Sequence, residues 1–130
     1  MQRSLTLQLL PGTFAVCRLS DQESVAQWNV AGAAFFSVTR TGDELSVVCP
    51  DAAVPAGVQA EPGWRIFKLE GPFAFSETGI LLSVIRPLAE AGIGIFALST
   101  FDTDYVMVKQ EFAAGTAAAL TSAGHQVKSD

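Results

Sequence analysis

Residues 73–109, FAFSETGILLSVIRPLAEAGIGIFALSTFDTDYVMVK, carry strand, turn, helix and hairpin signals in direct succession. A short apolar run over 72–75 predicts a strand, which ends in the polar residues 76–79. After that break, the apolar spacing changes from a period of two to a helical period. Apolar residues at i, i+3, i+4 and i+7 then predict one buried helix face, formed by Leu81, Val84, Ile85 and Leu88.

The expected helix has a start signal, an end signal and one interruption. Ser76 or Thr78 suits the N-cap, and Gly92 suits the position just past the C-terminal end, where φ is often positive. Pro87 removes one backbone donor, so we expect a kink or a tightened turn near Ser83. This single proline does not require the helix to end.

A hairpin and a second helix complete the C-terminal half. Two β-runs lie at 93–100 and 105–109, and an acidic, hydroxyl-bearing tip joins them. Residues 112–123 place apolar side chains on one helical face, and Gly124 predicts the helix end. A short strand at 125–127 follows. The order is βαββαβ, the split βαβ arrangement of ferredoxin-like α+β domains.

Residues 88–109, LAEAGIGIFALSTFDTDYVMVK, resemble the core of an ACT domain, the small ligand-sensing module of amino-acid metabolism. In that family the end of the helix, the next strand and the following hairpin carry the effector site. The C-terminal half is also similar to the ACT halves of the animal cytosolic arginine sensors called CASTOR, and to short bacterial ACT proteins. This resemblance implies the ACT fold and a small effector ligand.

The N-terminal half repeats this order with weaker patterns. Its composition changes to Ala, Pro, Gly and Val over 50–63, which predicts a loop there. The expected elements are strands at 5–9 and 13–19, a short helix at 20–28, a hairpin of 34–39 and 45–49, a helical turn near 54–58, and a strand at 64–69.

The repeated order predicts two small ACT-like units with antiparallel sheets. The N-terminal unit is expected over 1–70, with degenerate helices, and the C-terminal ACT domain over 71–130. Identity between the halves is too low to prove a duplication. The alternative is one ferredoxin-like domain preceded by a separate β-meander.

The composition is that of an acidic globular protein. Of 130 residues, 49% are hydrophobic, enough to bury a core. The formal net charge is −5 and Lys and Arg are not clustered, so we expect no nucleic-acid partner. No stretch reaches the roughly 18–20 apolar residues of a membrane helix. The alternation of Leu5, Leu7 and Leu9 favours a strand over a signal peptide, so we expect a cytoplasmic protein without a membrane partner.

The titratable side chains offer no catalytic set. His125 stands alone behind a helix-ending glycine, and we expect it at the surface or at a strand edge. Cys17 and Cys49 lie in apolar β-runs without zinc-ligand spacing, which predicts two buried reduced thiols, with a redox disulfide as the alternative. No phosphate-binding or dinucleotide motif is present. We therefore expect neither a cofactor nor an enzyme.

The start of the first long helix is one part of the candidate ligand site. Free backbone N–H groups and the positive end of the helix dipole stabilise a carboxylate there, and Gly79 allows close approach because it has no Cβ. The alternative is that Ser76 or Thr78 satisfies these donors as a cap. The expected ligand contacts on this side are Ser76, Glu77, Thr78, Gly79 and Ile80.

The hairpin tip is the other part of the candidate site. Asp102 and Asp104 alternate, so in strand geometry they share a face and can hold a protonated amine; solvated turn carboxylates are the alternative. A free amino acid, or a similar small zwitterion, would place its ammonium on Asp104 and its carboxylate on the helix start. The resemblance to the CASTOR-like proteins implies the same two loops. The expected contacts on this side are Ser99, Thr100, Phe101, Thr103 and Asp104.

These observations predict a non-catalytic amino-acid-binding regulatory or sensor protein. The alternative is a structural or protein-interaction module of the ACT fold with a vestigial site, and an enzyme is a third reading. Small ferredoxin-like units leave strand edges and one sheet face to be covered. We therefore expect a homodimer, or side-by-side pairing of the two ACT-like halves, through residues 93–98 and the face of Leu81, Val84 and Leu88.

Overall fold

The structure is a computed structural model that describes residues 4–129. The chain packs into two compact units: unit 1 is Met1–Pro11 with Arg65–Asp130, and unit 2 is Gly12–Trp64. The expected division into 1–70 and 71–130 cuts the chain once, whereas unit 1 joins two separate segments. The chain passes from unit 2 to unit 1 within a single strand, β5 (Gln59–Leu69).

Unit 1 confirms the predicted ferredoxin-like α+β order. From β5 onward the elements follow one another as βαββαβ, with a short 3₁₀ turn, η2 (Gln110–Phe112), before the second helix. The expected strand at 72–75 is wrong, because the chain between β5 and the first helix forms a loop. The remaining elements of unit 1 are β1 (Thr6–Leu9), α1 (Ile80–Glu90), β6 (Phe96–Ser99), β7 (Asp104–Lys109), α2 (Ala113–Ser122) and β8 (Gln126–Ser129).

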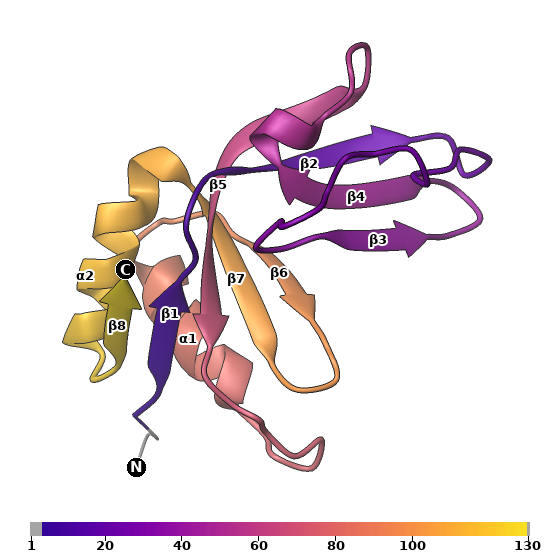
Figure 1. Ribbon diagram of the computed structural model, residues 1–130. Coiled ribbons are helices and arrows are strands. Elements are labelled where there is room, and N and C mark those ends of the chain that lie inside the picture. The colour runs from indigo at the N-terminus through magenta and orange to yellow at the C-terminus, as the bar shows by residue number, and fades with distance from the viewer. Residues whose placement is uncertain (1–3, 130) are drawn as a thin grey trace. The chain divides into compact units, whose positions relative to one another are not determined.

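Strand β1 is inserted into the sheet of unit 1, whose order is β8-β1-β5-β7-β6 (Figure 1). It runs antiparallel to β5, with Leu7 opposite Leu69, and parallel to β8, with Leu7 opposite Val127. The sheet is therefore mixed and not wholly antiparallel as expected. The physical reason is that β1 occupies the place between β5 and β8, so the last strand pairs with β1.

Both helices of unit 1 pack against one face of this sheet. Alternate residues of the strands are buried on that face, and α1 and α2 contribute side chains to the same apolar cluster. Burying one Leu or Phe side chain fully stabilises a fold by about 1.5–3 kcal/mol. The buried members of the cluster are Leu5, Leu7, Phe67, Leu69, Val84, Leu88, Val106, Val108 and Leu120.

Helix α1 continues through Pro87 to Glu90, as predicted, and Gly92 follows it with φ 75°. Pro87 has no N–H, so the carbonyl of Ser83, four residues earlier, loses its helical donor. His125 replaces that donor, because its Nε2 lies 3.0 Å from the Ser83 carbonyl oxygen. The expectation of a surface or strand-edge histidine is wrong: His125 is only 3% exposed.

Unit 2 is built from strands. Its sheet has the order β3-β4-β2, followed by the first part of β5, and all three pairings are antiparallel. The expected helix at 20–28 is wrong, because these residues form turns. The Arg40 guanidinium holds these turns in place by donating to the carbonyls of Asp21 and Glu23.

The helical turn expected near 54–58 lies a few residues earlier, as the 3₁₀ turn η1. The bounds are β2 (Phe14–Leu19), β3 (Ser37–Arg40), β4 (Leu45–Pro50) and η1 (Asp51–Ala53).

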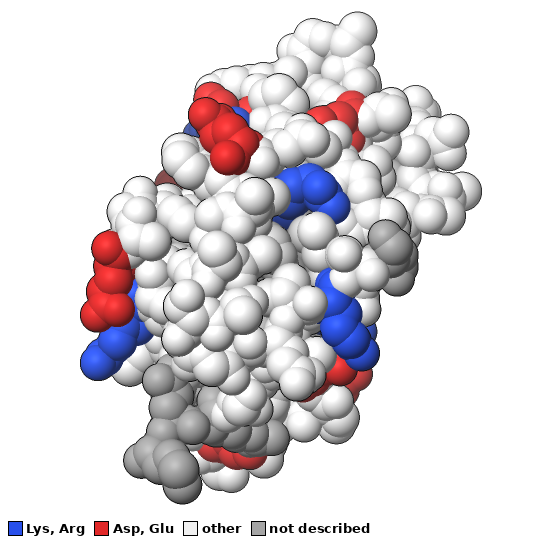
Figure 2. Space-filling view, turned by 90° about the vertical axis from the view of Figure 1, so that its left-hand side faces the viewer, with Lys and Arg blue, Asp and Glu red and all other residues white. Residues whose placement is uncertain are grey.

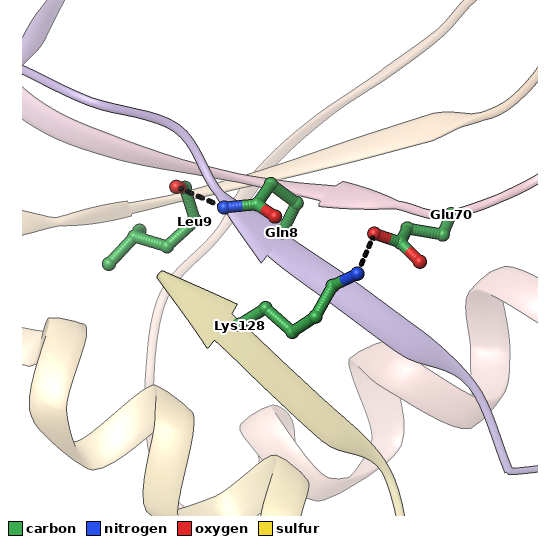
Figure 3. A network of polar contacts seen from close by, with 4 residues as sticks. All are labelled: Gln8, Leu9, Glu70 and Lys128. Atoms are coloured by element: carbon green, nitrogen blue, oxygen red, sulfur yellow. Dashed lines mark hydrogen bonds and ion pairs between the residues drawn. The ribbon is translucent and has the colours of Figure 1, made fainter. Parts of the chain in front are cut away.

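Charged side chains are dispersed over the surface. On the face drawn in Figure 2, Lys and Arg lie apart from one another, and some of them lie beside Asp or Glu. In unit 1, Lys128 Nζ on β8 lies 2.8 Å from Glu70 Oε2, beside Gln8 of β1 (Figure 3). Such an exposed pair contributes only about 0–1 kcal/mol. Among the described residues, no helix combines the length and the apolar character needed to cross a membrane.

The two cysteines are free and buried in unit 2, which confirms the expected pair of reduced thiols. They lie on the neighbouring strands β2 and β4 and belong to one apolar cluster. Burial raises the pKa of the Cys49 thiol to about 12, and the neighbouring Cys17 adds to the shift. Burial also raises the pKa of Cys17. Both side chains therefore behave as small apolar groups at neutral pH.

We expect the free energy of unfolding to fall as the pH rises from about 9 towards 12. The pKa of Cys49 is higher in the folded state, so its contribution is complete below the pKa of the unfolded thiol and is lost above it. The loss between pH 7 and pH 10 should be about 1–2 kcal/mol in urea titrations. Cys49→Ala should lose less between the same two pH values. An equal loss in wild type and variant would contradict this assignment.

Candidate functional site

Two loops of unit 1 meet at the end of β5 and border a hollow of about 190 Å³. One is the 70–79 loop before α1, and the other is the β6–β7 turn. They are joined by a hydrogen bond from the Phe73 N–H to the Asp102 carbonyl, 3.0 Å long. A Cβ on Gly71 would lie 3.1 Å from that same carbonyl oxygen, so this approach favours glycine.

Thr103 anchors the turn to the sheet. It is buried, with 6% of its surface exposed, and its hydroxyl donates to the Leu69 carbonyl at 2.6 Å. Its own carbonyl accepts the Thr100 N–H at 2.8 Å. The predicted residue Thr103 therefore lies at the hollow, but its hydroxyl proton is already used by the protein. Its role in this geometry is to support the wall.

The polar lining of the hollow is acidic. Glu77, Asp102 and Asp104 all border it, and no Lys or Arg is among the residues that line it. The Ser99 hydroxyl donates to Asp104 Oδ1, and the Ala74 N–H donates to Glu77 Oε2 at 3.0 Å. The second carboxylate oxygen of Asp104 can accept from a ligand. A positively charged group is the partner that this lining favours.

Two exposed phenylalanines stand at the rim. Phe75 from the loop and Phe101 from the turn are 79% and 80% exposed. Their ring centroids are 5.2 Å apart with an interplanar angle of 85°, an edge-to-face contact. Aromatic side chains are usually buried, so a pair left this open next to carboxylates is unusual. Ring faces of this kind attract cations within about 6 Å.

The start of α1 lies beside the hollow. Gly79 occupies the N-cap with φ 76° and ψ 2°, and no side chain caps the helix. The prediction that Ser76 or Thr78 caps the helix is therefore wrong: Gly79, in the left-handed region that favours glycine, takes that position. The first-turn N–H groups have no intrahelical acceptor, and a bound anion can serve as one.

The structure brings seven of the ten predicted contact residues together at the hollow. Ser76, Thr78 and Gly79 do not line it, and Gly79 instead borders a second hollow of about 180 Å³ with Leu82, Ser83 and Arg86. Sequence reasoning missed Phe73, Ala74 and Phe75, because their apolar run read as a strand. The full lining is Phe73, Ala74, Phe75, Glu77, Ile80, Ser99, Thr100, Phe101, Asp102, Thr103 and Asp104.

No metal-binding cluster accompanies the hollow in residues 4–129. No group of three or more His, Cys, Asp or Glu side chains is placed there to hold a metal ion. His125 uses both ring nitrogens within the fold, since Nδ1 accepts the Leu5 N–H at 3.0 Å while Nε2 faces Ser83. The arrangement can hold a small polar ligand by charge and hydrogen bonds.

The fold is that of an ACT domain. Residues 59–122 match the family model described as ACT domain, and residues 12–57 match a model for an N-terminal domain. The chain therefore contains an ACT domain over residues 59–122. The matched ACT segment covers β5 to α2, so it contains both loops of the hollow.

Similar proteins are known by sequence and by structure. The bovine (Bos taurus) cytosolic arginine sensor for mTORC1 subunit 1 is 30% identical over 88 residues, 59% of this chain and 27% of the relative, so the chain spans about a quarter of it. A crystal structure of an Agobacterium tumefaciens protein is 46% identical, covers 99% of this chain and 96% of its own, and has a TM-score of 0.91. The ligand-free regulatory subunit of Thermus thermophilus aspartate kinase shares the fold, at 13% identity over 85% of this chain and 91% of its own, with a TM-score of 0.58.

We expect Thr103→Val to destabilise unit 1. The substitution keeps the shape of the side chain but leaves the Leu69 carbonyl without its donor, at a cost of about 1–2 kcal/mol. Thr100→Val is the matched control, because Thr100 is exposed and its hydroxyl bond, 3.2 Å to the Thr103 carbonyl, is longer. Urea denaturation should separate the two variants. Equal stability would show that Thr103 does not anchor the turn.

Proposed function

We propose that this protein is a non-catalytic amino-acid sensor that binds its ligand in the hollow between the 70–79 loop and the β6–β7 turn. The observation that carries the proposal is the combination of acidic lining and an uncapped helix start. A free amino acid has one group for each: its ammonium can reach Asp104 or Glu77, and its carboxylate can reach the first-turn N–H groups. Seven of the ten sequence-predicted contacts are proposed on this basis, because they line the hollow, whereas Ser76, Thr78 and Gly79 are proposed from the sequence alone.

The lining favours a basic amino acid over a neutral or acidic one. Three carboxylates border the hollow without a Lys or Arg beside them, so a second positive charge on the ligand gains attraction. The exposed rings of Phe75 and Phe101 offer a planar cation a face to stack on. The relatives named as arginine sensors support arginine as the first ligand to test.

The setting proposed for this module is cytoplasmic, in keeping with relatives named cytosolic. We propose a homodimer, because β6 and β8 are the edge strands of unit 1 and leave backbone groups to pair. No enzymatic activity, cofactor, nucleic acid or membrane is part of the proposal.

A structural module with a vestigial site is the second candidate. Phe75 and Phe101 favour it, because two phenylalanines about 80% exposed also suit contact with another protein. The substitution Phe101→Ser distinguishes the two proposed functions. A sensor should lose ligand affinity in this variant, whereas an interaction module should lose a protein partner and show no ligand response in wild type.

We expect arginine to bind with a dissociation constant in the micromolar to millimolar range. Two charge-assisted contacts, each worth about 1.5–3 kcal/mol, are partly offset by desolvation and immobilisation of the ligand. Calorimetry with arginine, lysine, glutamine and glutamate should show the two basic amino acids binding more tightly. Asp104→Ala should weaken arginine at least about tenfold, corresponding to about 1.4 kcal/mol.

The control is Asp43→Ala, which removes an exposed turn carboxylate from unit 2. It should leave the arginine affinity unchanged. Uniform silence of all twenty amino acids at millimolar concentration would rule out the sensor. Tighter binding of glutamate than of arginine would refute the proposal that the ligand is positively charged. The binding site would then have to be located by other variants.

A further inference from the structure

Ser83 ties the first turn of α1 together. Its N–H donates to the Gly79 carbonyl at 3.0 Å, and its hydroxyl donates to the Ile80 carbonyl at 2.7 Å. Ile80 lines the hollow, and Gly79 is the N-cap of the helix. The position of the Ser83 backbone therefore sets where the free N–H groups of the helix start point.

His125 fixes that backbone from outside the helix. In an uninterrupted α-helix, the N–H of residue 87 would donate to the Ser83 carbonyl, but Pro87 has none. The Leu5 N–H must donate to Nδ1, so the ring proton is on Nε2 and is shared with Ser83. The imidazole replaces the missing helical bond with one that comes from the strand side of unit 1.

The ring itself is held firmly. The His125 N–H donates to the Leu120 carbonyl at the end of α2, at 3.0 Å, and the next residue, Gln126, donates to the Leu5 carbonyl at 2.8 Å. The side chain is almost fully buried. A continuous series of hydrogen bonds thus runs from Leu5, the residue before β1, through His125 and Ser83 to the helix start at the hollow.

We propose that His125 is a positioning residue for the ligand site, which holds the first turn of α1 through the Ser83 carbonyl. The inference rests on the proposed function, because the site that it positions is the amino-acid site. His125 does not touch the ligand. Its contribution is to keep the helix-start N–H groups oriented before the ligand arrives, so that binding loses less freedom.

Two substitutions test separately the hydrogen bonds made by the two ring nitrogens of His125. His125→Asn keeps an acceptor near Nδ1 for the Leu5 N–H but does not reach Ser83. His125→Gln keeps a donor at the Nε2 position for Ser83 but does not satisfy Leu5. Pro87→Ala restores an N–H to the helix, and this N–H can take over the Ser83 carbonyl without the histidine. The readouts are arginine affinity by calorimetry and hydrogen exchange of the Ser83 and Val84 amides without ligand.

We expect His125→Asn to weaken arginine about three- to tenfold and to speed exchange of these two amides by a similar factor. His125→Gln should keep the arginine affinity within about twofold of wild type, although its melting temperature falls. The double variant His125→Asn with Pro87→Ala should regain both the affinity and the slow exchange. Such rescue distinguishes positioning of the helix from a general loss of packing.

Unchanged amide exchange in His125→Asn, or no rescue by Pro87→Ala, would overturn the proposal. If His125→Asn alone does not fold, the double variant decides: wild-type arginine affinity supports the proposal and weak binding overturns it. If wild type binds no amino acid, the proposed function fails, and the exchange measurements still test the positioning of the helix start by His125.

Discussion

Insertion of β1 between β5 and β8 is the constraint on which unit 1 depends. The strand and the residue before it supply Leu7 and Leu5 to the core, and the strand pairs on both sides, so the N-terminal segment and the C-terminal strand hold each other in place. Without β1, β8 would have no partner in this sheet. His125 is bound to the same strand, and through it the position of β1 is transmitted to α1. A fold that closes in this way brings segments more than 100 residues apart into one hydrogen-bonded layer.

The position of the candidate site depends on the strand that pairs with the other side of β5. Strand β7 pairs with β5, so the turn before β7 lies next to the loop that follows β5. Thr103 bonds to the last residue of β5, and Phe73 bonds to the turn. The walls of the hollow are thus fixed by hydrogen bonds to backbone carbonyls, whereas Phe75, Phe101 and the carboxylates stay accessible. Rigid walls with exposed charged and aromatic groups are suited to a small cationic ligand.

Much of unit 1 could be predicted from the sequence because its signals are local. The spacing of Leu81, Val84 and Leu88 and the glycines at 92 and 124 place both helices correctly within a few residues. The insertion of β1 could not be predicted, since it depends on pairing across the chain. The helix expected at 20–28 failed for a similar reason: its weak pattern could not compete with the contacts of Arg40 from a distant strand. His125 was misplaced because only the fold reveals that Pro87 leaves a carbonyl for it. The ten predicted contact residues stay predictions, although the fold gathers seven of them at one hollow.

The central claim is that a basic amino acid occupies the hollow of unit 1. An NMR titration of the labelled protein with arginine tests it most directly, because it reports both the binding and its place. We expect saturable shifts at Phe75, Glu77, Phe101 and Asp104 and at the first turn of α1, with residues of unit 2 unchanged. Shifts confined to unit 2, or a spectrum unaltered at millimolar arginine, would contradict it.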